Sequence, residues 1–262
     1  MKDKIDRINR STMANSATQY AEIQGLTPPE IAALQHIEIN DNDPILDLGV
    51  GGGRTVRPLH DVSKNYLGVD YVEEMVEVCR QKHPGCRFEQ GDARKLEQFD
   101  DESFQMVFFS MNGISMVDHD GRLQILSEVH RILKPGGYFL FSTYNIDSED
   151  HRKLLHLPGF RFSTNPVRTL VRCARFTRNL LISINNRVRY RRHEIHTAEY
   201  SIVNDRCHNY STMLYYISLE EQKKQLVETG FDETTILAFD LSGSRIDEPI
   251  NHDSIFYLVT KP

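Results

Sequence analysis

The stretch ILDLGVGGGRT, residues 45–55, decides the fold of this 262-residue chain. Ile45–Leu48 form a short, mostly apolar run that ends at a cluster of glycines. A glycine-rich turn between a strand and a helix lets backbone N–H groups come close to a ligand. We therefore interpret this stretch as the first strand of an α/β domain, followed by its ligand-binding turn.

The spacing of the glycines limits the kind of ligand. Dinucleotide sites carry the fingerprint G-x-G-x-x-G. Counted from Gly49, the third glycine would fall on Arg54, and counted from Gly51 it would fall on Val56, so neither register fits. No G-K-[ST] follows, which excludes a P-loop. The pattern is instead D-x-G-x-G-x-G, carried by Asp47, Gly49, Gly51 and Gly53. A carboxylate in such a turn suits a ligand with a cationic amino-acid end better than it suits a pyrophosphate.

Two further acids follow at the ends of short segments. Asp70 ends YLGVD (66–70), 23 residues after Asp47 (70 − 47), where a strand-end carboxylate can accept hydrogen bonds from ribose hydroxyls. Asp92 follows FEQG (88–91). Each acid alone could be a helix cap, but three such features in this order indicate a nucleoside-containing ligand.

Strands and helices alternate along most of the chain. Apolar runs predict strands at Ile45–Leu48, Tyr66–Val69, Met106–Phe109, Tyr138–Phe141, Thr234–Phe239 and Ile255–Thr260. Helical spacing predicts helices at Val72–Gln81, Gly121–Leu133 and Leu219–Thr229. Such alternation implies a parallel sheet with helices on both faces, the three-layer α/β class. We expect a Rossmann-like domain over 1–145 and 218–262, with an N-terminal helical arm and an insertion over 146–217.

The chain resembles the class I S-adenosylmethionine-dependent methyltransferases. The segments that carry the resemblance are ILDLGVGGGRT (45–55), YLGVD (66–70), GDA (91–93), SFQMVFFSMNG (103–113), EVHRILKPGGYFLFS (128–142) and Thr229-Gly230-Phe231. The resemblance implies a seven-stranded, mostly parallel sheet whose last strand is antiparallel between its neighbours. It also implies S-adenosylmethionine as the methyl donor.

The resemblance implies a role for each matching residue in the donor site. Asp47 and the three glycines of the turn approach the methionine end. Asp70 accepts from the ribose hydroxyls, and Tyr71 lies beside the adenosine. Asp92 accepts from the adenine amino group, while the backbone N–H of Ala93 donates to the ring. Near the sulfonium we expect Ser110, and over the donor we expect Tyr20 of the N-terminal arm.

Methyl transfer from a sulfonium is an in-line displacement, so positioning and desolvation can supply much of the catalysis. A general base is needed only when the acceptor must lose a proton. The candidates near the expected sulfonium are Asn112, which contacts donor or acceptor, and His119, which could act as the base. Either could equally be structural, Asn112 as a turn residue and His119 as a surface residue at a helix start.

The insertion is strongly basic. Residues 151–193 contain eleven Lys and Arg and no Asp or Glu. Because the net charge of the whole chain is −6, the remaining residues together carry a charge of −17 (−6 − 11). Asn165-Pro166 predicts the start of a helix, with Arg168, Arg172 and Arg175 on one face. This face could bind an anionic acceptor or an anionic membrane surface, or it could simply be solvated.

Beyond this helix, a hairpin of Glu199–Val203 and Cys207–Ile217 with a turn at Asn204-Asp205 is expected to form a lid over the acceptor. Candidate acceptor contacts are Asn145, His193, His196, Tyr200, His208 and Tyr210. His193 and His196 have no third residue at ligand spacing, so we expect no metal site.

Composition fits these expectations. The chain begins MKDKIDRINR, without the apolar core of a signal peptide, and no apolar run approaches the ~20 residues of a membrane span. The four cysteines form no C-x-x-C pair, so scattered thiols of a cytoplasmic protein are expected. A net charge of −6 argues against a nucleic-acid-binding protein whose surface is covered with basic residues.

Together these features predict a cytoplasmic enzyme that methylates an N or O atom of a small-molecule or sugar-containing acceptor, including one that is anionic or lipid-linked. Two alternatives stay open: an RNA methyltransferase, which the basic insertion would serve, and a regulator that binds the donor without turnover. The acceptor and the oligomeric state do not follow from the sequence.

Overall fold

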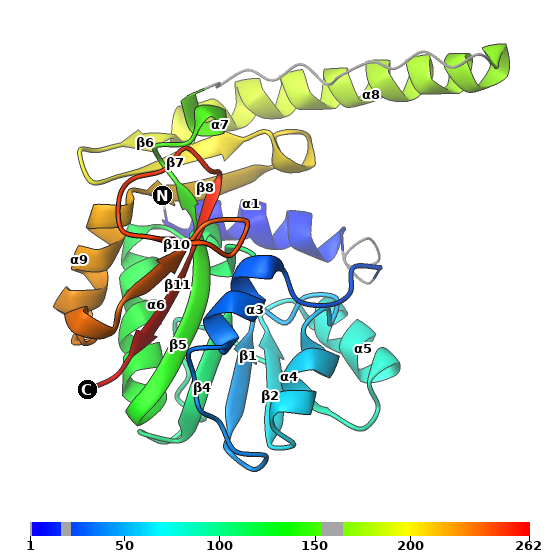
Figure 1. The fold of residues 1–262 in the computed structure, drawn as a ribbon. Helices are drawn as coiled ribbons and strands as arrows, with labels where there is room; N and C mark the ends of the chain where they lie inside the picture. Colours follow the sequence, from blue (N-terminus) through cyan, green and yellow to red (C-terminus); the bar gives the residue numbers. More distant parts are fainter. Residues whose placement is uncertain (1, 17–21, 153–164) are drawn as a thin grey trace.

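The computed structural model describes residues 2–16, 22–152 and 165–262 (Figure 1). Its centre is one mixed sheet with the strand order β10-β9-β11-β5-β4-β1-β2-β3. The bounds are β1 Ile45–Leu48, β2 Tyr66–Asp70, β3 Arg87–Gln90, β4 Phe104–Phe109, β5 Leu133–Asn145, β9 Leu237–Phe239, β10 Arg245–Ile246 and β11 Ser254–Thr260. Strands β1 to β5 run parallel, and β11 is antiparallel to both β5 and β9.

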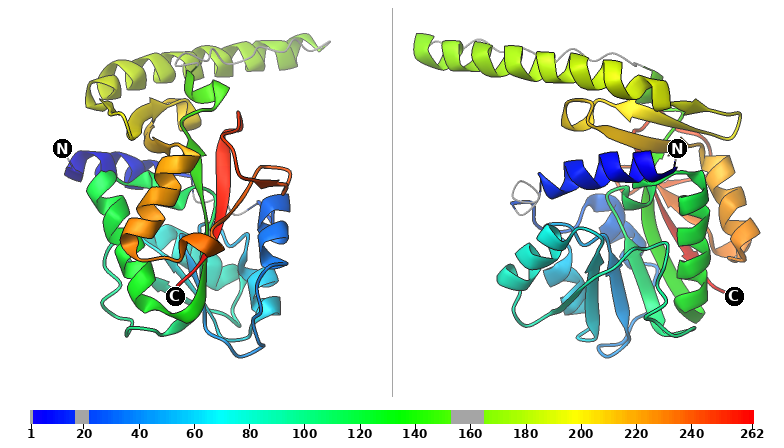
Figure 2. Two further views of the ribbon diagram at one scale, coloured as in Figure 1. Left: turned by 60° about the vertical axis from the view of Figure 1, so that its left-hand side comes forward. Right: turned by 180° about the vertical axis from the view of Figure 1, so that it is seen from behind.

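Helices cover both faces of the sheet, which confirms the predicted three-layer α/β architecture. Their bounds are α1 Lys2–Ala14, α3 Pro28–Leu34, α4 Val56–Val62, α5 Glu73–Lys82, α6 His119–Ile132, α7 Glu149–Arg152, α8 Pro166–Tyr190 and α9 Leu219–Thr229. α3, α4 and α5 lie on one face, and α6 and α9 lie on the other (Figures 1 and 2). Each face has its own apolar core, because strand side chains alternate between the two.

The predicted number of seven strands was too low. The described residues form eleven strands, because the short β10 extends one edge and the insertion contributes three more. These three are β6 Ile195–His196, β7 Tyr200–Asp205 and β8 Thr212–Ile217. β8 pairs in parallel with the end of β5, so the insertion continues the sheet instead of forming a separate layer.

The predicted hairpin is present, with β7 and β8 antiparallel from Tyr200↔Ile217 to Asp205↔Thr212. The predicted turn at Asn204-Asp205 was wrong, because both residues belong to β7. The connection lies farther along, over residues 206–211, and contains the short 3-10 helix η3 (Cys207–Asn209). The Asn204 side chain explains the shift: its Nδ2 donates to the carbonyls of Tyr210 and Thr212 and so ties the connection to β7.

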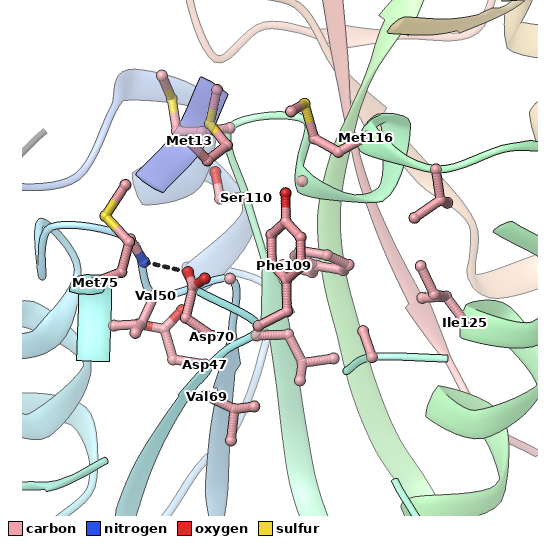
Figure 3. A pocket seen from close by; sticks show the side chains of 18 of the residues that line it. Met13, Asp47, Val50, Val69, Asp70, Met75, Phe109, Ser110, Met116 and Ile125 are labelled. Atoms are coloured by element: carbon pink, nitrogen blue, oxygen red, sulfur yellow. Dashed lines mark hydrogen bonds between the residues drawn. The ribbon is translucent and has the colours of Figure 1, made fainter. Parts of the chain in front are cut away.

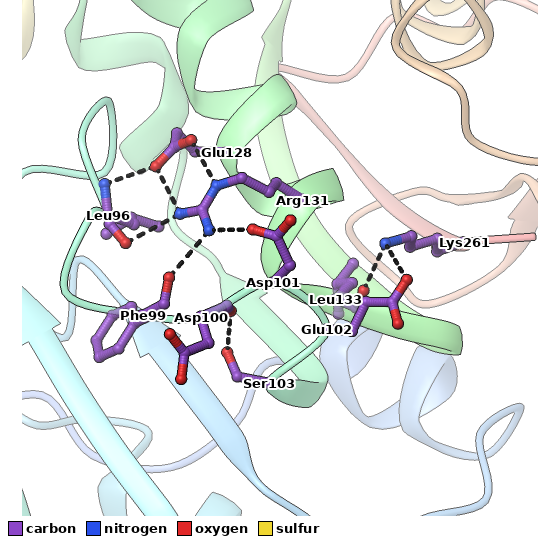
Figure 4. Close-up of polar contacts among 10 residues, drawn as sticks. All are labelled: Leu96, Phe99, Asp100, Asp101, Glu102, Ser103, Glu128, Arg131, Leu133 and Lys261. Carbon is purple, nitrogen blue, oxygen red and sulfur yellow. Dashed lines mark hydrogen bonds and ion pairs between the residues drawn. The ribbon is translucent and has the colours of Figure 1, made fainter.

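A polar cluster fixes the long loop between β3 and β4 against α6 (Figure 4). The Arg131 guanidinium donates to the carbonyls of Leu96 and Phe99 at 3.0 and 2.9 Å and pairs with Asp101 at 2.7 Å. Glu128 holds the same guanidinium and accepts from Leu96 N at 2.7 Å. The loop that begins with Asp92 is therefore held from its far end.

Within the described ranges we find no helix with the length and hydrophobicity that a membrane crossing requires.

Candidate functional site

A cavity of about 200 Å³ lies where β1, β2 and β4 end (Figure 3). This is the usual position of a ligand in an open α/β sheet. Its floor is formed by the glycine turn after β1, with Asp47 beside it, and by Asp70 at the end of β2. Its upper wall carries apolar side chains from α1, from the segment after β4, from the end of β5 and from the lid: Met13, Met111, Met116, Val117, Tyr144 and Leu214.

The turn after β1 takes its shape from glycine. Gly49, Gly51 and Gly53 all have positive φ, at 63°, 54° and 82°. At Gly49 there is also no room for a side chain, because a Cβ would lie 2.7 Å from the Phe109 ring. Gly49 and Gly51 line the cavity, whereas Gly53 packs near Cys79 and His83 and shapes the turn from behind.

Two buried carboxylates face this turn. Asp47 Oδ2 accepts from Thr55 Oγ1 at 2.5 Å and from the Tyr66 hydroxyl at 2.8 Å. Asp70 accepts from the backbone N–H groups of Gly51 and Val72, both at 2.9 Å. Burial raises the pKa of Asp47 to about 7 and that of Asp70 to about 6, despite these hydrogen bonds.

These raised pKa values bear on what the cavity can hold. Neither carboxylate forms an ion pair within 4.0 Å with any described side chain, although the charges of Arg54 and Arg10 lower the pKa of Asp47 and of Asp70, respectively, from a longer range. A ligand that brings an ammonium group, or hydroxyl donors, would satisfy them. The Tyr71 hydroxyl is also buried without a hydrogen-bond partner. The donor set therefore fits a nucleoside with a cationic amino-acid end.

On the expected adenine side the geometry is more crowded. Asp92 lines the cavity, but its carboxylate is held by Arg94 through Nε at 2.9 Å and Nη2 at 2.5 Å. Asp6 of α1 adds a second carboxylate, 3.2 Å from Arg94. Because Arg94 already occupies both Asp92 oxygens, an adenine amino group would have to share this acceptor.

The sequence did not reveal an ion pair behind the cavity. Glu30 of α3 is fully buried and pairs with Arg54 at 2.5 and 2.8 Å. Ser110, at the end of β4, donates its hydroxyl to the same carboxylate. Ser110 lines the cavity, as predicted, but its hydroxyl is directed to Glu30. From the sequence, Glu30 would be interpreted only as a residue that caps the start of a helix. It also does this in the structure, since its carboxylate accepts from Thr27 N at 2.6 Å.

The N-terminal arm closes one side of the cavity through Asn9. This buried side chain of α1 donates to the carbonyls of Met116 and Met213, both at 2.7 Å, and accepts from Met213 N at 2.9 Å. It thus joins α1, the segment after β4 and β8, and brings Met13 to the cavity wall. Tyr20, the arm residue expected to contact the donor, lies outside the described residues.

Two stretches at the cavity mouth have left-handed backbone. Met111 and Asn112 have φ of 51° and 61°, and His208, Asn209 and Tyr210 have φ of 51°, 56° and 59°. Consecutive non-glycine residues in this region cost conformational energy and concentrate at functional sites. Met111 and His208 line the cavity, so the strain lies at the rim itself.

The structure places the predicted donor residues and one predicted acceptor residue around the cavity: Asp47, Gly49, Gly51, Asp70, Tyr71, Asp92, Ala93, Ser110 and His208. Other predicted contacts are not in its wall: Asn112, His119, Asn145, His193, His196, Tyr200 and Tyr210. Their hydrogen bonds and packing explain why each of these side chains lies outside the cavity wall.

The two asparagines are occupied by structural hydrogen bonds. Asn112 Nδ2 donates to Ser254 Oγ at 2.9 Å, so the side chain turns toward β11 and away from the cavity. Asn145 Nδ2 donates to the carbonyls of Ile250 and His252. Asn145 thus satisfies loop carbonyls and Asn112 a side chain of β11, and neither partner can be read from a position in the sequence.

His119 belongs to a cluster behind the lid. Its ring stacks on Tyr200, with centroids 4.3 Å apart, and its Nδ1 lies 2.8 Å from the Tyr215 hydroxyl. Below Tyr215 lies Arg122, fully buried, whose guanidinium is held by Thr143, Gln222, Gln225 and the Ile114 carbonyl. The cluster fastens the hairpin to α6 and α9, so Tyr200 and His119 are placed to hold the lid.

The remaining predicted acceptor contacts lie on the outer side of the lid. His196 is exposed, and His193 lies with Lys4, Arg7, Arg189 and Arg192 between α1 and the end of α8. Tyr210 is buried under the Arg187 guanidinium. Within the described ranges no three His, Cys, Asp or Glu side chains come together as a metal site.

Comparison with known proteins identifies the segment around the glycine turn. Residues 45–137 match a family model described as "Methyltransferase domain". A phthiotriol/phenolphthiotriol dimycocerosates methyltransferase of Mycobacterium tuberculosis is 38% identical over 105 residues, which are 38% of this chain and 37% of that protein. A demethylmenaquinone methyltransferase of Chlorobaculum tepidum is 32% identical over 106 residues, 40% of this chain and 42% of that protein. The chain thus matches less than half the length of these relatives.

Solved structures match over most of the chain. An S-adenosylmethionine-dependent methyltransferase from Mesorhizobium loti aligns with a TM-score of 0.57 and 17% identity, covering 88% of this chain and 96% of that one. A glycopeptide N-methyltransferase solved with S-adenosylmethionine aligns with a TM-score of 0.56 and 18% identity, covering 92% and 95%. At this identity the likeness is one of fold.

Proposed function

We propose that this chain is a class I S-adenosylmethionine-dependent methyltransferase, with residues 45–137 as its matching domain, and that it transfers the donor's methyl group to a small-molecule acceptor. The observation that carries the proposal is the pair of buried carboxylates, Asp47 and Asp70, which form no ion pair within 4.0 Å with a described side chain and flank a turn of positive-φ glycines. The donor brings a cationic amino-acid end and a ribose diol to this position.

In this proposal the chain holds the donor at three points. Asp47 and the N–H groups of the glycine turn take the methionine end, and Asp70 accepts from the ribose hydroxyls. Tyr71 and the Asp92–Ala93 segment border the adenine. When bound, the donor supplies an electrophilic methyl on a sulfonium, and the protein contributes orientation and a wall that excludes water.

The acceptor enters from the apolar side of the cavity. Its wall there consists of Met111, Met116, Val117, Tyr144 and Leu214. This lining suits an acceptor with a hydrophobic body around the nucleophilic N or O atom. The names of the relatives support such an acceptor, since they refer to dimycocerosates and to demethylmenaquinone. A small molecule with a sugar or a lipid portion fits the same description.

His208 is positioned to accept the proton of such an acceptor. It lines the cavity, and burial lowers its pKa below the usual range, so the imidazole is neutral near pH 7. We expect His208→Asn, which tolerates the left-handed backbone, to lower kcat by about 100-fold or more and to leave donor affinity unchanged. The variant's kcat should also lose the acidic limb of its pH profile. His193→Asn is the matched control; if both variants turn over equally, His208 is not the base.

Donor affinity should rise with pH in the neutral range. The pKa values of about 7 for Asp47 and about 6 for Asp70 mean that both are partly protonated at pH 6 in the free protein. If the donor binds the ionised forms, the association constant should increase between about pH 5 and 8 and then level off, at most tenfold per pH unit and group. Calorimetry in buffers of different ionisation enthalpy would show proton release on binding. An affinity that does not change over this range would contradict the assignment.

Incubation with methyl-labelled S-adenosylmethionine and a panel of hydrophobic alcohols, phenols and amines tests the activity itself. Labelled acceptor together with S-adenosylhomocysteine is the expected result. RNA is incubated in parallel. If the donor binds tightly but neither the panel nor RNA yields S-adenosylhomocysteine, the protein binds the donor without turnover.

A further inference from the structure

α8 is unlike the other helices because its apolar side chains face solvent. It extends away from the body of the molecule in every view (Figures 1 and 2). Its large apolar residues with high exposed fractions are Leu170 (72%), Leu181 (63%), Ile184 (52%) and Val188 (76%). At 3.6 residues per turn these four positions fall on one side and form a stripe about 27 Å long.

Positive charge borders this apolar stripe. The helix has six arginines and no Asp or Glu over residues 166–190. Helical spacing places Arg178 and Arg189 next to the stripe and Arg175 one step farther around, and all three are exposed. Of the six arginines, Arg187 is turned inward and pairs with Glu194. The outer surface of α8 therefore joins an apolar band to an uncompensated cationic band.

The last turns of α8 are fastened to the lid. Asn186 Nδ2 donates to the Asn209 carbonyl at 2.9 Å, and Arg187 donates to the Asn204 carbonyl at 3.1 Å. The first contact holds η3, whose Cys207 and His208 line the cavity, and the second holds β7. Whatever binds the outer surface of α8 is thus connected to the rim of the candidate site by a single short segment.

We propose that α8 docks the protein on an anionic phospholipid surface, with the Leu170–Val188 stripe in the interface and the arginines on the phosphates. An apolar band bordered by arginine is the arrangement of helices that lie in a membrane interface. The stripe would also suit a helical partner by its spacing of three and four residues. Pairing with α8 of a second copy would bring Arg175, Arg178 and Arg189 of both copies together, so charge favours an anionic partner.

Sedimentation of the full chain with vesicles tests the proposal without donor or acceptor. Wild type should bind phosphatidylcholine vesicles containing phosphatidylglycerol, bind pure phosphatidylcholine much more weakly, and lose affinity with added salt. Because each arginine near such a surface contributes about a fivefold factor, R175E/R178E/R189E should lower the partition coefficient by about 100-fold or more. L170Q/L181Q/I184Q/V188Q keeps helix propensity and should abolish binding.

Matched variants away from α8 are the controls. R57E/K64E/K224E changes the same amount of exposed charge, and L123Q/L241Q removes exposed apolar side chains elsewhere; both should bind vesicles as wild type does. Unchanged S-adenosylmethionine affinity and melting temperature would show that the α8 variants are folded. The proposal would be overturned if the wild-type protein does not bind anionic vesicles, or if it binds neutral vesicles with the same affinity. A dimer that the stripe variant converts to monomer would reassign α8 to a protein interface.

Discussion

Asp70→Ala is expected to lower the affinity for S-adenosylmethionine by about 100- to 1000-fold while leaving the protein folded. Hydrogen bonds to a charged group contribute about 1.5–3 kcal/mol each, and the proposed site gives this carboxylate both ribose hydroxyls. The same carboxylate accepts from Gly51 N and Val72 N, so its loss also releases the glycine turn. Calorimetric titration of the purified variant with the donor measures the change.

The effect should be specific to this acid. Because burial raises the pKa of Asp70 to about 6, the charged form destabilises the fold near neutral pH, and Asp70→Ala should be as stable as wild type or more so at pH 8. Asp61→Ala, which removes an acid that is 80% exposed, is the matched control and should bind the donor normally. A donor affinity of Asp70→Ala within threefold of wild type would mean that the ribose is held elsewhere.

The parts of the fold that could be predicted are those with a local cause. Asp47, the glycines and the strand before them lie within a few residues of one another, and apolar runs mark β1, β2, β4 and β5. β3 has only one buried side chain, Phe88, and therefore no such run. Leu219–Thr229 was predicted at its observed bounds, since Ser218 caps it and Gly230 ends it. The count of seven strands failed because β8 pairs with β5 across the whole insertion, a contact that leaves no local pattern.

The acceptor side of the site depended on such distant contacts and was predicted poorly. His119 and Tyr200 looked like binding residues by type and by topology, yet they stack on each other 81 positions apart (200 − 119) and hold the lid. Asn9, which no motif marks, joins three segments of the cavity wall. Residue type thus indicated which segments carry polar side chains near the site. The hairpin register and the position of α1 decide which of these side chains face the ligand.

Glu30→Ala is expected to be the most destabilising single change considered for this chain, at about 3–5 kcal/mol, because it leaves the Arg54 guanidinium nearly buried without its partner. Burial by itself would raise the pKa of Glu30, but the hydrogen bonds and charge of Arg54, with those from Ser110 and Thr27, hold it below the usual range. For a depressed carboxylate this stabilisation is complete above the ordinary carboxyl pKa and disappears as pH falls through the lowered value.

Thermal unfolding should therefore show Glu30→Ala melting about 10 °C below wild type at pH 7, with a smaller difference as the pH is lowered into the acidic range. The double variant E30L/R54M separates a lost ion pair from a lost side chain. Replacing both partners by apolar groups removes the buried charge altogether, so it should recover much of the stability that Glu30→Ala loses. If E30L/R54M instead loses as much free energy of unfolding as E30L and R54M lose together, the Glu30–Arg54 pair has no coupling energy. Because Ser110 donates to Glu30 from the cavity wall, the same variants report whether the pair also sets the position of that wall: donor affinity in E30L/R54M should fall even where stability is restored.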